Sequence, residues 1–395
     1  MLHMLSKPKY RDFVLGIGLL CAGAALVLYP SQSMDAGRQG LQLCFNVIFP
    51  SLFPFFVLSS LVVELGMARY IGQALEPIMR PVFRVSGPGS SALVLGFVGG
   101  YPVGARTAIR LYETKQLTKS EVQRLLAFCN NSGPAFILGV VGTGVFGSGS
   151  VGLLLYFVHM AASLCVGLLF RFYGRPATEQ PFASRTPQFQ AVRFSHAFTD
   201  SIKNSFSSLL NICAFVVFFS VLIRLLSLCG IMEAAACLLT ALPLHLDPAM
   251  AQHLLVGLVE VSSGVAGLIG EGALGERISM AAFMLGWAGL SVHCQVLSFL
   301  ADSELSAFPY LLGKVLHGLL SALFTTGLMR LFPLPQPASS YLAAQAESFT
   351  LLEINRSFAL ATASAWLLWL GFSVVSILII RTSKKRGGKF IKFAL

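Results

Sequence analysis

The 395-residue chain is 55% hydrophobic and 11% charged, with a formal net charge of +11. Soluble domains contain about 25% charged residues, so this composition excludes a soluble globular protein and is typical of an all-α polytopic membrane protein. The lysines and arginines lie between the apolar runs and at the chain ends, so they indicate membrane orientation rather than a nucleic-acid partner.

Basic residues set the orientation of the predicted spans in chain order. Lys7, Lys9 and Arg11 place the N-terminus inside, and the apolar run behind them lacks a clear cleavage site, so we expect an uncleaved first helix. The loop 31–42 carries no net charge and is expected outside. The apolar runs predict about eight helices near the 20 residues that span a bilayer. These helices are predicted at 12–30, 43–66, 125–144, 151–172, 208–230, 279–300, 306–331 and 358–380.

The stretch "GFVGGYPVGAR" at 96–106 places glycines and a proline in an apolar region, although both are poor in a helix interior. Basic segments at 67–91 and 106–124 flank it, so both flanks are expected in the cytoplasm. As a helix, 92–105 would rise only about 21 Å, which is too short to cross. The alternatives are an ordinary surface turn and a re-entrant segment. We predict the re-entrant segment, since irregular backbone at membrane depth is tolerated when it is buried in protein or lines a wet cavity.

A second re-entrant segment is predicted within 254–270, "LLVGLVEVSSGVAGLIG". No lysine or arginine lies between Arg224 and Arg277, so this segment is expected to enter from the outside, opposite to the first. Each half then has a broken segment, an interrupted helix and a further helix, an inverted-topology repeat of the kind found in many secondary transporters. The predicted helix breaks are Gly99, Gly100, Pro102, Gly104, Gly133, Pro134 and Gly264. The predicted domains are 1–42 (first helix and outer loop), 43–173 (first repeat), 174–207 (cytoplasmic linker), 208–332 (second repeat) and 333–395 (outer loop, last helix and basic cytoplasmic tail).

Three motifs, "GFVGGYPVGAR", "AFCNNSGPAFILG" and "GLSVHCQV", together resemble the YlbJ-like sporulation integral membrane proteins. These proteins carry nucleoside-recognition Gate domains and are distantly similar to concentrative nucleoside transporters. The resemblance covers about residues 45–330. It implies an endospore-forming bacterium and movement of dipicolinic acid, a small aromatic dicarboxylate, from the mother cell toward the forespore.

Candidate substrate-binding residues lie at the predicted breaks. Arg106 is equally a contact for an anionic substrate or a cytoplasmic anchor. The amides and hydroxyl of Asn130, Asn131 and Ser132 suit either hydrogen bonds to a ligand or helix–helix contacts. Lys314 lies roughly 12 Å into its predicted helix, deep for a lysine that reaches the interface. The full candidate set is Tyr101, Arg106, Asn130, Asn131, Ser132, Ser291, His293, Gln295 and Lys314.

Glu260, with Ser262 and Ser263, is the candidate site for a coupling ion or a proton, because a carboxylate at membrane depth needs a partner, a proton or water. His293 is either a titrating group or a hydrogen-bonded packing residue, and His159, alone in an apolar helix, is expected to be structural. Lys314 and His317 share one helix face.

The sequence therefore predicts a transporter of a small anionic metabolite, dipicolinate by resemblance, in the lipid bilayer of a bacterial cell membrane that surrounds the forespore, with both termini cytoplasmic. A nucleoside transporter and a non-transporting sporulation assembly protein are the alternatives. A coupling proton or sodium ion and a homo-oligomer are further expected partners. Motifs for membrane metalloproteases, serine or aspartyl proteases and phosphate-binding loops are missing from the sequence, so we expect no enzyme, cofactor, bound metal or nucleic acid.

Overall fold

A computed structural model describes residues 8–65, 67–174, 194–241, 246–270, 272–301 and 303–331, with residues 362, 363 and 366 beyond them. Every regular element in these ranges is a helix, which confirms the predicted all-α class. The predicted helix at 358–380, the basic tail and most of the linker 174–207 lie outside the described residues.

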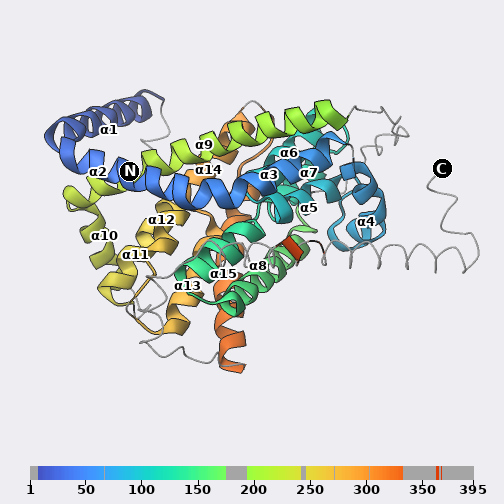
Figure 1. Cartoon of the computed structure of the whole chain (residues 1–395). Helices are drawn as coiled ribbons and strands as arrows, with labels where there is room; N and C mark the ends of the chain where they lie inside the picture. The colour runs from blue at the N-terminus through green and yellow to red at the C-terminus, as the bar shows by residue number, and fades with distance from the viewer. Residues whose placement is uncertain are drawn as a thin grey trace, which may run out of the picture.

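Two long helical rods lie side by side along one edge of the molecule (Figure 1). The first consists of α2 (Pro30–Leu43), the π-helical turn η1 (Cys44–Ile48) and α3 (Phe49–Glu64), and the second is α9 (Phe194–Leu228). Small residues on α2 allow the close contact, since a Cβ at Gly40 would lie 3.1 Å from Val217 Cα on α9. We call this pair of rods the arm.

The segment 31–42, expected as an outer loop, is helical. Pro30 begins α2, a position where its fixed φ suits a helix and its missing N–H is not needed. The preceding α1 (Pro8–Leu28) meets α2 at a bend of 98°, measured between Gly16–Leu28 and Pro30–Ile48. The expectation of a loop at 31–42 is therefore wrong, and the chain bends instead between Leu28 and Pro30.

The rest of the described chain divides into two halves with the same order of elements. Each half has a short helix, a hairpin of two helices, a helix interrupted midway and an uninterrupted apolar helix. The first half consists of α4 (Met67–Phe83), α5 (Gly89–Gly99), α6 (Val103–Glu113), α7 (Lys119–Leu126), η2 (Ala135–Val145, π-helical) and α8 (Gly149–Phe170). The second half consists of α10 (Ile231–Thr240), α11 (Pro248–Val259), α12 (Val261–Ala266), α13 (Leu274–Trp287), α14 (Gly289–Ala301) and α15 (Phe308–Leu331).

Four helices among the described residues are long and apolar enough to cross a membrane, or five if the bent first pair counts as one span. They are α8, α9, the α13–α14 pair and α15. The predicted span at 125–144 is built instead of two short helices, α7 and η2, because residues 127–134 leave the helical conformation. The first hairpin is longer than the predicted 92–105, since α5 and α6 extend from 89 to 113.

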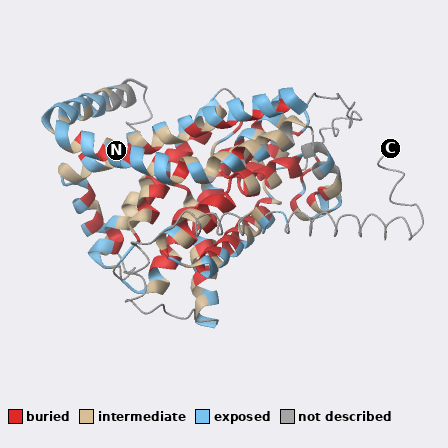
Figure 2. Cartoon of the chain, viewed as in Figure 1, coloured by how far each residue is buried: buried red, intermediate tan, exposed pale blue. Residues whose placement is uncertain are grey.

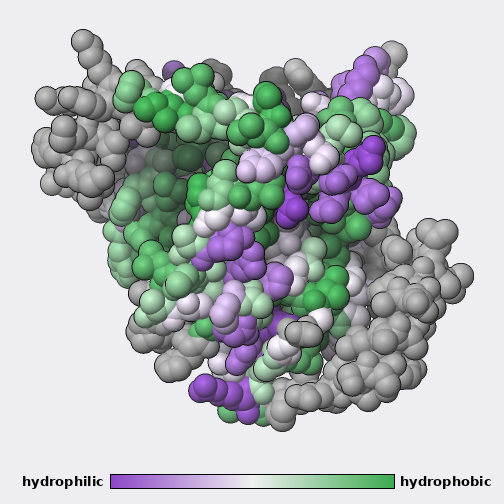
Figure 3. Space-filling model, turned by 90° about the vertical axis from the view of Figure 1, so that its left-hand side faces the viewer, coloured by the Kyte–Doolittle hydropathy of each residue, from purple (hydrophilic) through white to green (hydrophobic). Residues whose placement is uncertain are grey.

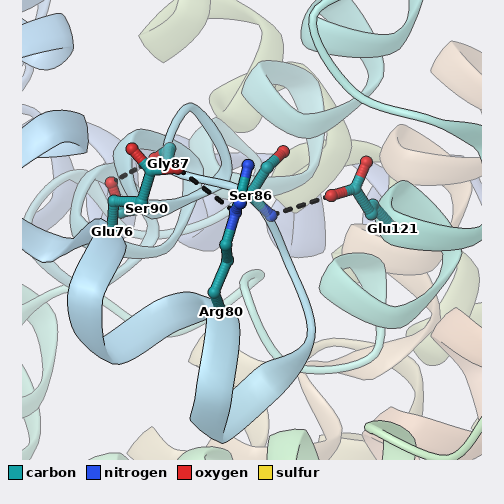
Figure 4. Close-up of polar contacts among 6 residues, drawn as sticks. All are labelled: Glu76, Arg80, Ser86, Gly87, Ser90 and Glu121. Atoms are coloured by element: carbon teal, nitrogen blue, oxygen red, sulfur yellow. Dashed lines mark hydrogen bonds and ion pairs between the residues drawn. The ribbon is translucent and has the colours of Figure 1, made fainter. Parts of the chain in front are cut away.

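Polar contacts at the base of the first half fix where its hairpin begins (Figure 4). Thr118 and Glu121 form a capping box at the start of α7. The second oxygen of Glu121 accepts a hydrogen bond from the backbone N–H of Ser86, 2.8 Å away, in the turn before α5. The Ser90 hydroxyl donates to the Gly87 carbonyl at 2.7 Å in the same turn, so α5 starts from a turn anchored on α7.

Buried side chains concentrate where the two halves and the arm meet, while apolar side chains remain exposed on the outer helices (Figure 2). On α9, for example, Phe198, Phe206 and Phe218 are at least 42% exposed. Green hydrophobic side chains cover much of the face formed by α1, α2, α10 and α11, with hydrophilic ones gathered in bands (Figure 3). Exposed apolar surface of this extent marks contact with lipid or protein, in keeping with a multi-pass membrane protein.

Candidate functional site

The tips of the two hairpins and the two helix interruptions meet in the middle of the molecule, beside the arm. The first tip is the turn at Gly100–Pro102 between α5 and α6, and the second is Glu260 between α11 and α12. The first interruption is 127–134, between α7 and η2, and the second is Ala288, between α13 and α14. Each tip packs on the interruption of its own half.

Glycines make the first contact possible. Gly100 has φ +74° and ψ −176°, a backbone conformation that only glycine adopts readily. A Cβ on Gly100 would lie 2.9 Å from the backbone nitrogen of Gly133. A Cβ on Gly96 or Gly104 would overlap the Cys129 carbonyl. The backbones of α5 and α6 therefore contact the interruption directly, with no side chain between them. The Tyr101–Pro102 peptide bond at this tip is cis.

The second hairpin tip also packs closely on the interruption of its own half, but a carboxylate takes part there. Gly289, with φ +82°, lies against the second tip, where a Cβ would be 3.0 Å from the Val261 nitrogen. Glu260 caps α12, and its two carboxylate oxygens accept hydrogen bonds from the N–H groups of Ser262 at 3.0 Å and Ser263 at 2.7 Å. The carboxylate is 1% exposed, so these two N–H groups stabilise its charge at the positive end of the helix.

A partly open cavity lies between these tips, the interruptions and the arm. Its walls are mainly apolar and include the aromatic rings of Phe56, Phe136 and Phe215. Polar groups come from both halves, and none of the described residues in the lining is a lysine, arginine or histidine. The predicted site residues on its surface are Gly99, Gly100, Tyr101, Ser132, Gly133, Glu260, Ser262, Ser291 and Gln295.

The other predicted site residues lie outside this lining. Arg106 is exposed on α6, where its guanidinium lies 5.8 Å from the centroid of the Phe299 ring. Asn131 is fully buried and donates to the Phe128 carbonyl at 2.9 Å. His293 is 2% exposed and its Nδ1 lies 2.9 Å from the Tyr310 hydroxyl. The remaining residues outside the lining are Pro102, Gly104, Asn130, Pro134, Ser263, Gly264 and Lys314.

Lys314 is fully enclosed behind the first interruption. Its amine donates to the Asn130 carbonyl at 3.0 Å and lies 3.5 Å from His317 Nδ1 and 5.5 Å from the centroid of the Tyr101 ring. Tyr101 therefore separates Lys314 from the cavity. The Tyr101 hydroxyl donates a hydrogen bond to the Leu285 carbonyl in the other half, at 3.0 Å.

Several side chains at the site were not singled out from the sequence. His159, read there as structural, accepts a hydrogen bond at Nε2 from the Ser132 N–H at 3.0 Å and so holds the first interruption. Trp287 donates to the Leu258 carbonyl at 3.1 Å and thereby ties α13 to the second hairpin. The arm residues Phe56 and Phe215 carried no signal, because apolar side chains in apolar helices do not reveal which face meets a cavity.

Comparison with known proteins agrees with this architecture. The family model described as nucleoside recognition, named Gate, matches residues 45–149. The chain is 34% identical over 344 residues to the sporulation integral membrane protein YlbJ of Bacillus subtilis (strain 168), covering 81% of this chain and 83% of that protein. The chain therefore belongs to the YlbJ family.

The solved structures that match the YlbJ-family fold are of CNTnw, a concentrative nucleoside transporter. A variant in the intermediate 3 state has a TM-score of 0.50 at 13% identity, covering 84% of this chain and 89% of that chain. The inward-facing substrate-bound state has a TM-score of 0.47 at 14% identity, covering 83% and 88%. The YlbJ-family chain thus has a transporter-like fold, and this confirms the resemblance read from the three motifs.

Proposed function

We propose that this YlbJ-family protein transports a small aromatic carboxylate across a sporulation membrane, and that the substrate binds in the cavity between the hairpin tips. The observation that carries the proposal is the convergence of four breaks on one cavity. Secondary transporters bind substrate where discontinuous helices meet near the middle of the membrane, because the freed backbone groups and helix ends face the ligand there.

Dipicolinate is the substrate we propose. Its flat ring suits the apolar walls that carry Phe56, Phe136 and Phe215. Its carboxylates would accept hydrogen bonds from Ser132, whose buried hydroxyl has no partner among the described residues, and from the Gln295 amide. The relative is named a sporulation protein, and the resemblance to its family implies movement of dipicolinate.

A nucleoside is the second candidate, and the composition of the cavity lining favours it. Among the residues that the structure describes, the lining contains the carboxylate of Glu260 and no basic side chain to balance an anionic substrate. Hydroxyl and amide groups next to aromatic walls also suit a neutral nucleoside. The two candidates differ in charge, so a direct flux comparison separates them.

The test is flux into proteoliposomes that contain the purified full-length protein, with radiolabelled dipicolinate, uridine and adenosine as substrates. We expect dipicolinate uptake above empty vesicles and no nucleoside uptake. Nucleoside uptake without dipicolinate uptake would establish the second candidate. Lack of uptake of all three by folded protein would contradict both and favour a non-transporting assembly protein.

A matched pair of variants ties the flux to the cavity. Ser291→Ala removes a hydroxyl from the cavity lining, whereas Ser298→Ala removes one from the same helix outside it. A neutral hydrogen bond is worth about 0.5–1.5 kcal/mol, so Ser291→Ala should weaken apparent affinity by roughly two- to tenfold. Equal effects of the two variants would contradict the location of the site.

A further inference from the structure

Lys314 on α15 is a buried amine without a carboxylate partner. Its side chain is 1% exposed, and no acidic residue forms an ion pair with it among the residues the structure describes. A buried charge needs compensation, because removing it from water is costly. The compensation here comes from the Asn130 carbonyl, His317 Nδ1 and the face of the Tyr101 ring.

The Asn130 carbonyl lies in the first interruption, beyond the end of α7. The helix ends at Leu126, so the carbonyls that follow have no helical partners. The Phe128 carbonyl accepts from Asn131 Nδ2 and the Ser163 hydroxyl, at 2.9 Å and 2.7 Å. The Asn130 carbonyl accepts from the Lys314 amine at 3.0 Å. Backbone carbonyls of unwound segments are among the groups that bind coupling cations in transporters, and at Asn130 the Lys314 amine occupies that position.

Two histidines fix how this ammonium is held. Ser132 donates its N–H to His159 Nε2 at 3.0 Å, so the neutral His159 ring carries its proton on Nδ1. His317 lies with Nε2 2.9 Å from the His159 carbonyl, to which it donates, which leaves Nδ1 free to accept from Lys314. The Lys314 amine is thereby connected to both sides of the interruption, at Asn130 and, through the histidines, at Ser132.

We propose that the Lys314 ammonium is a built-in cation at the first interruption, in the place where a free alkali cation would otherwise be needed. Transport through the cavity then requires neither sodium nor potassium at this break. The transport half of this inference rests on the proposed function, whereas the binding half concerns the folded protein alone.

The binding half is tested on purified full-length protein by thermal unfolding and radioactive sodium binding in sodium, potassium and choline media of equal ionic strength. We expect the wild type to unfold at the same temperature in all three media and to bind no sodium. Lys314→Ala removes the ammonium but leaves its acceptors and its space, so its unfolding temperature should rise with sodium or ethylammonium. Lys314→Met refills the space without charge and should respond to neither. Lys119→Ala, which changes an exposed lysine at the start of α7, is the matched control and should behave like the wild type.

The transport half is tested by flux in the same three media. We expect equal wild-type flux in all three, a loss of about tenfold or more in Lys314→Met, equivalent to 1.4 kcal/mol, and partial recovery of Lys314→Ala by ethylammonium. Sodium that stabilises the wild type or is required for its flux would overturn the inference, and so would full flux in Lys314→Met. If the Lys314 variants do not fold, the wild-type sodium measurements still decide. If no substrate is transported, the proposed function fails and the binding half is decided separately.

Discussion

Two glycines that lie between helices pack against each other where the first hairpin meets the first interruption. Gly100 adopts a backbone conformation that other residues rarely adopt. Gly133 leaves room for it, since a Cβ on Gly133 would lie 3.3 Å from Gly100 Cα and N. This contact brings the hairpin tip to the cavity wall, so its geometry affects the site as well as the fold.

Gly100→Ala should reduce both stability and flux. The backbone strain alone is worth on the order of 1–3 kcal/mol, and the new Cβ also pushes against Gly133. Gly139→Ala is the matched control, because a Cβ at Gly139 on η2 has no heavy atom within 4 Å. Thermal unfolding and proteoliposome flux measure the two effects. A Gly100→Ala protein as stable and active as Gly139→Ala would show that the close contact is unimportant.

Glu260 has a structural role in addition to any part in ion coupling. Each of its carboxylate oxygens accepts one N–H at the start of α12, and Gln has only one oxygen that accepts. Glu260→Gln should therefore lower the free energy of unfolding by about 0.5–2 kcal/mol, the usual value of a helix cap, and reduce flux.

Asp247→Ala, which removes the capping oxygen, is the control for Glu260→Gln. Asp247 Oδ1 caps α11 by accepting the Met250 N–H at 2.9 Å, and Asp247 is not part of the cavity lining. The control should lose stability and keep its flux. If Glu260→Gln retains flux with the ion and pH profile of the wild type, Glu260 has no coupling role.

At the scale of elements, the ends of α4 and α8 are predicted to depend on one buried arginine of α7. Arg124 on α7 donates from Nε to the Tyr173 carbonyl after α8 and from Nη1 to the Arg84 carbonyl after α4, both at 2.7 Å. It is 6% exposed, so solvent cannot replace either bond.

Arg124→Lys should destabilise the protein, because the single amine of lysine cannot reach both carbonyls in the geometry of a guanidinium. A hydrogen bond to a charged group is worth about 1.5–3 kcal/mol, and the loss of one sets the expected decrease in stability. Arg110→Lys, at an exposed position on α6, should change stability little. The measurement is thermal unfolding in detergent, and equal midpoints for the two variants would contradict the proposed role.

For the whole molecule, the orientation in the membrane remains a prediction from charge. Lys119 lies 3.9 Å from Glu304 as an ion pair, so the acidic loop before α15 and the basic segment before α7 share one side of the molecule. The positive-inside rule places that side in the cytoplasm.

Single cysteines on a cysteine-free background test this topology through labelling by an impermeant reagent. Arg80→Cys and Lys115→Cys should label from the cytoplasmic side, and Glu233→Cys on α10 from the opposite side. All three positions are exposed to solvent or lipid headgroups. Labelling of positions 80 and 115 from opposite sides would show that the first hairpin crosses the membrane, and labelling of 233 with them would contradict the inverted repeat.

The sequence by itself determined the class of the protein and indicated some of the places where its helices break, whereas Gly104 and Gly264, also expected at breaks, lie inside α6 and α12. Apolar run length and low charge are local properties, so they were sufficient to predict an all-α membrane protein. Glycine and proline act on their own backbone, so Gly100, Pro102 and Gly133 marked breaks without knowledge of the fold. Net charge failed at 31–42, because an amphipathic helix that packs on α9 has the composition of a loop.

Only the tertiary structure decided which of these residues face the cavity. Lys314 and Ser132 were grouped in one predicted substrate site, yet Ser132 lines the cavity and Lys314 lies behind Tyr101. His159 is 158 residues from His317 in the chain, but its carbonyl lies 2.9 Å from His317 Nε2. Such contacts depend on how α8, α15 and the first interruption pack together, and the residue spacing along any one helix does not contain that information.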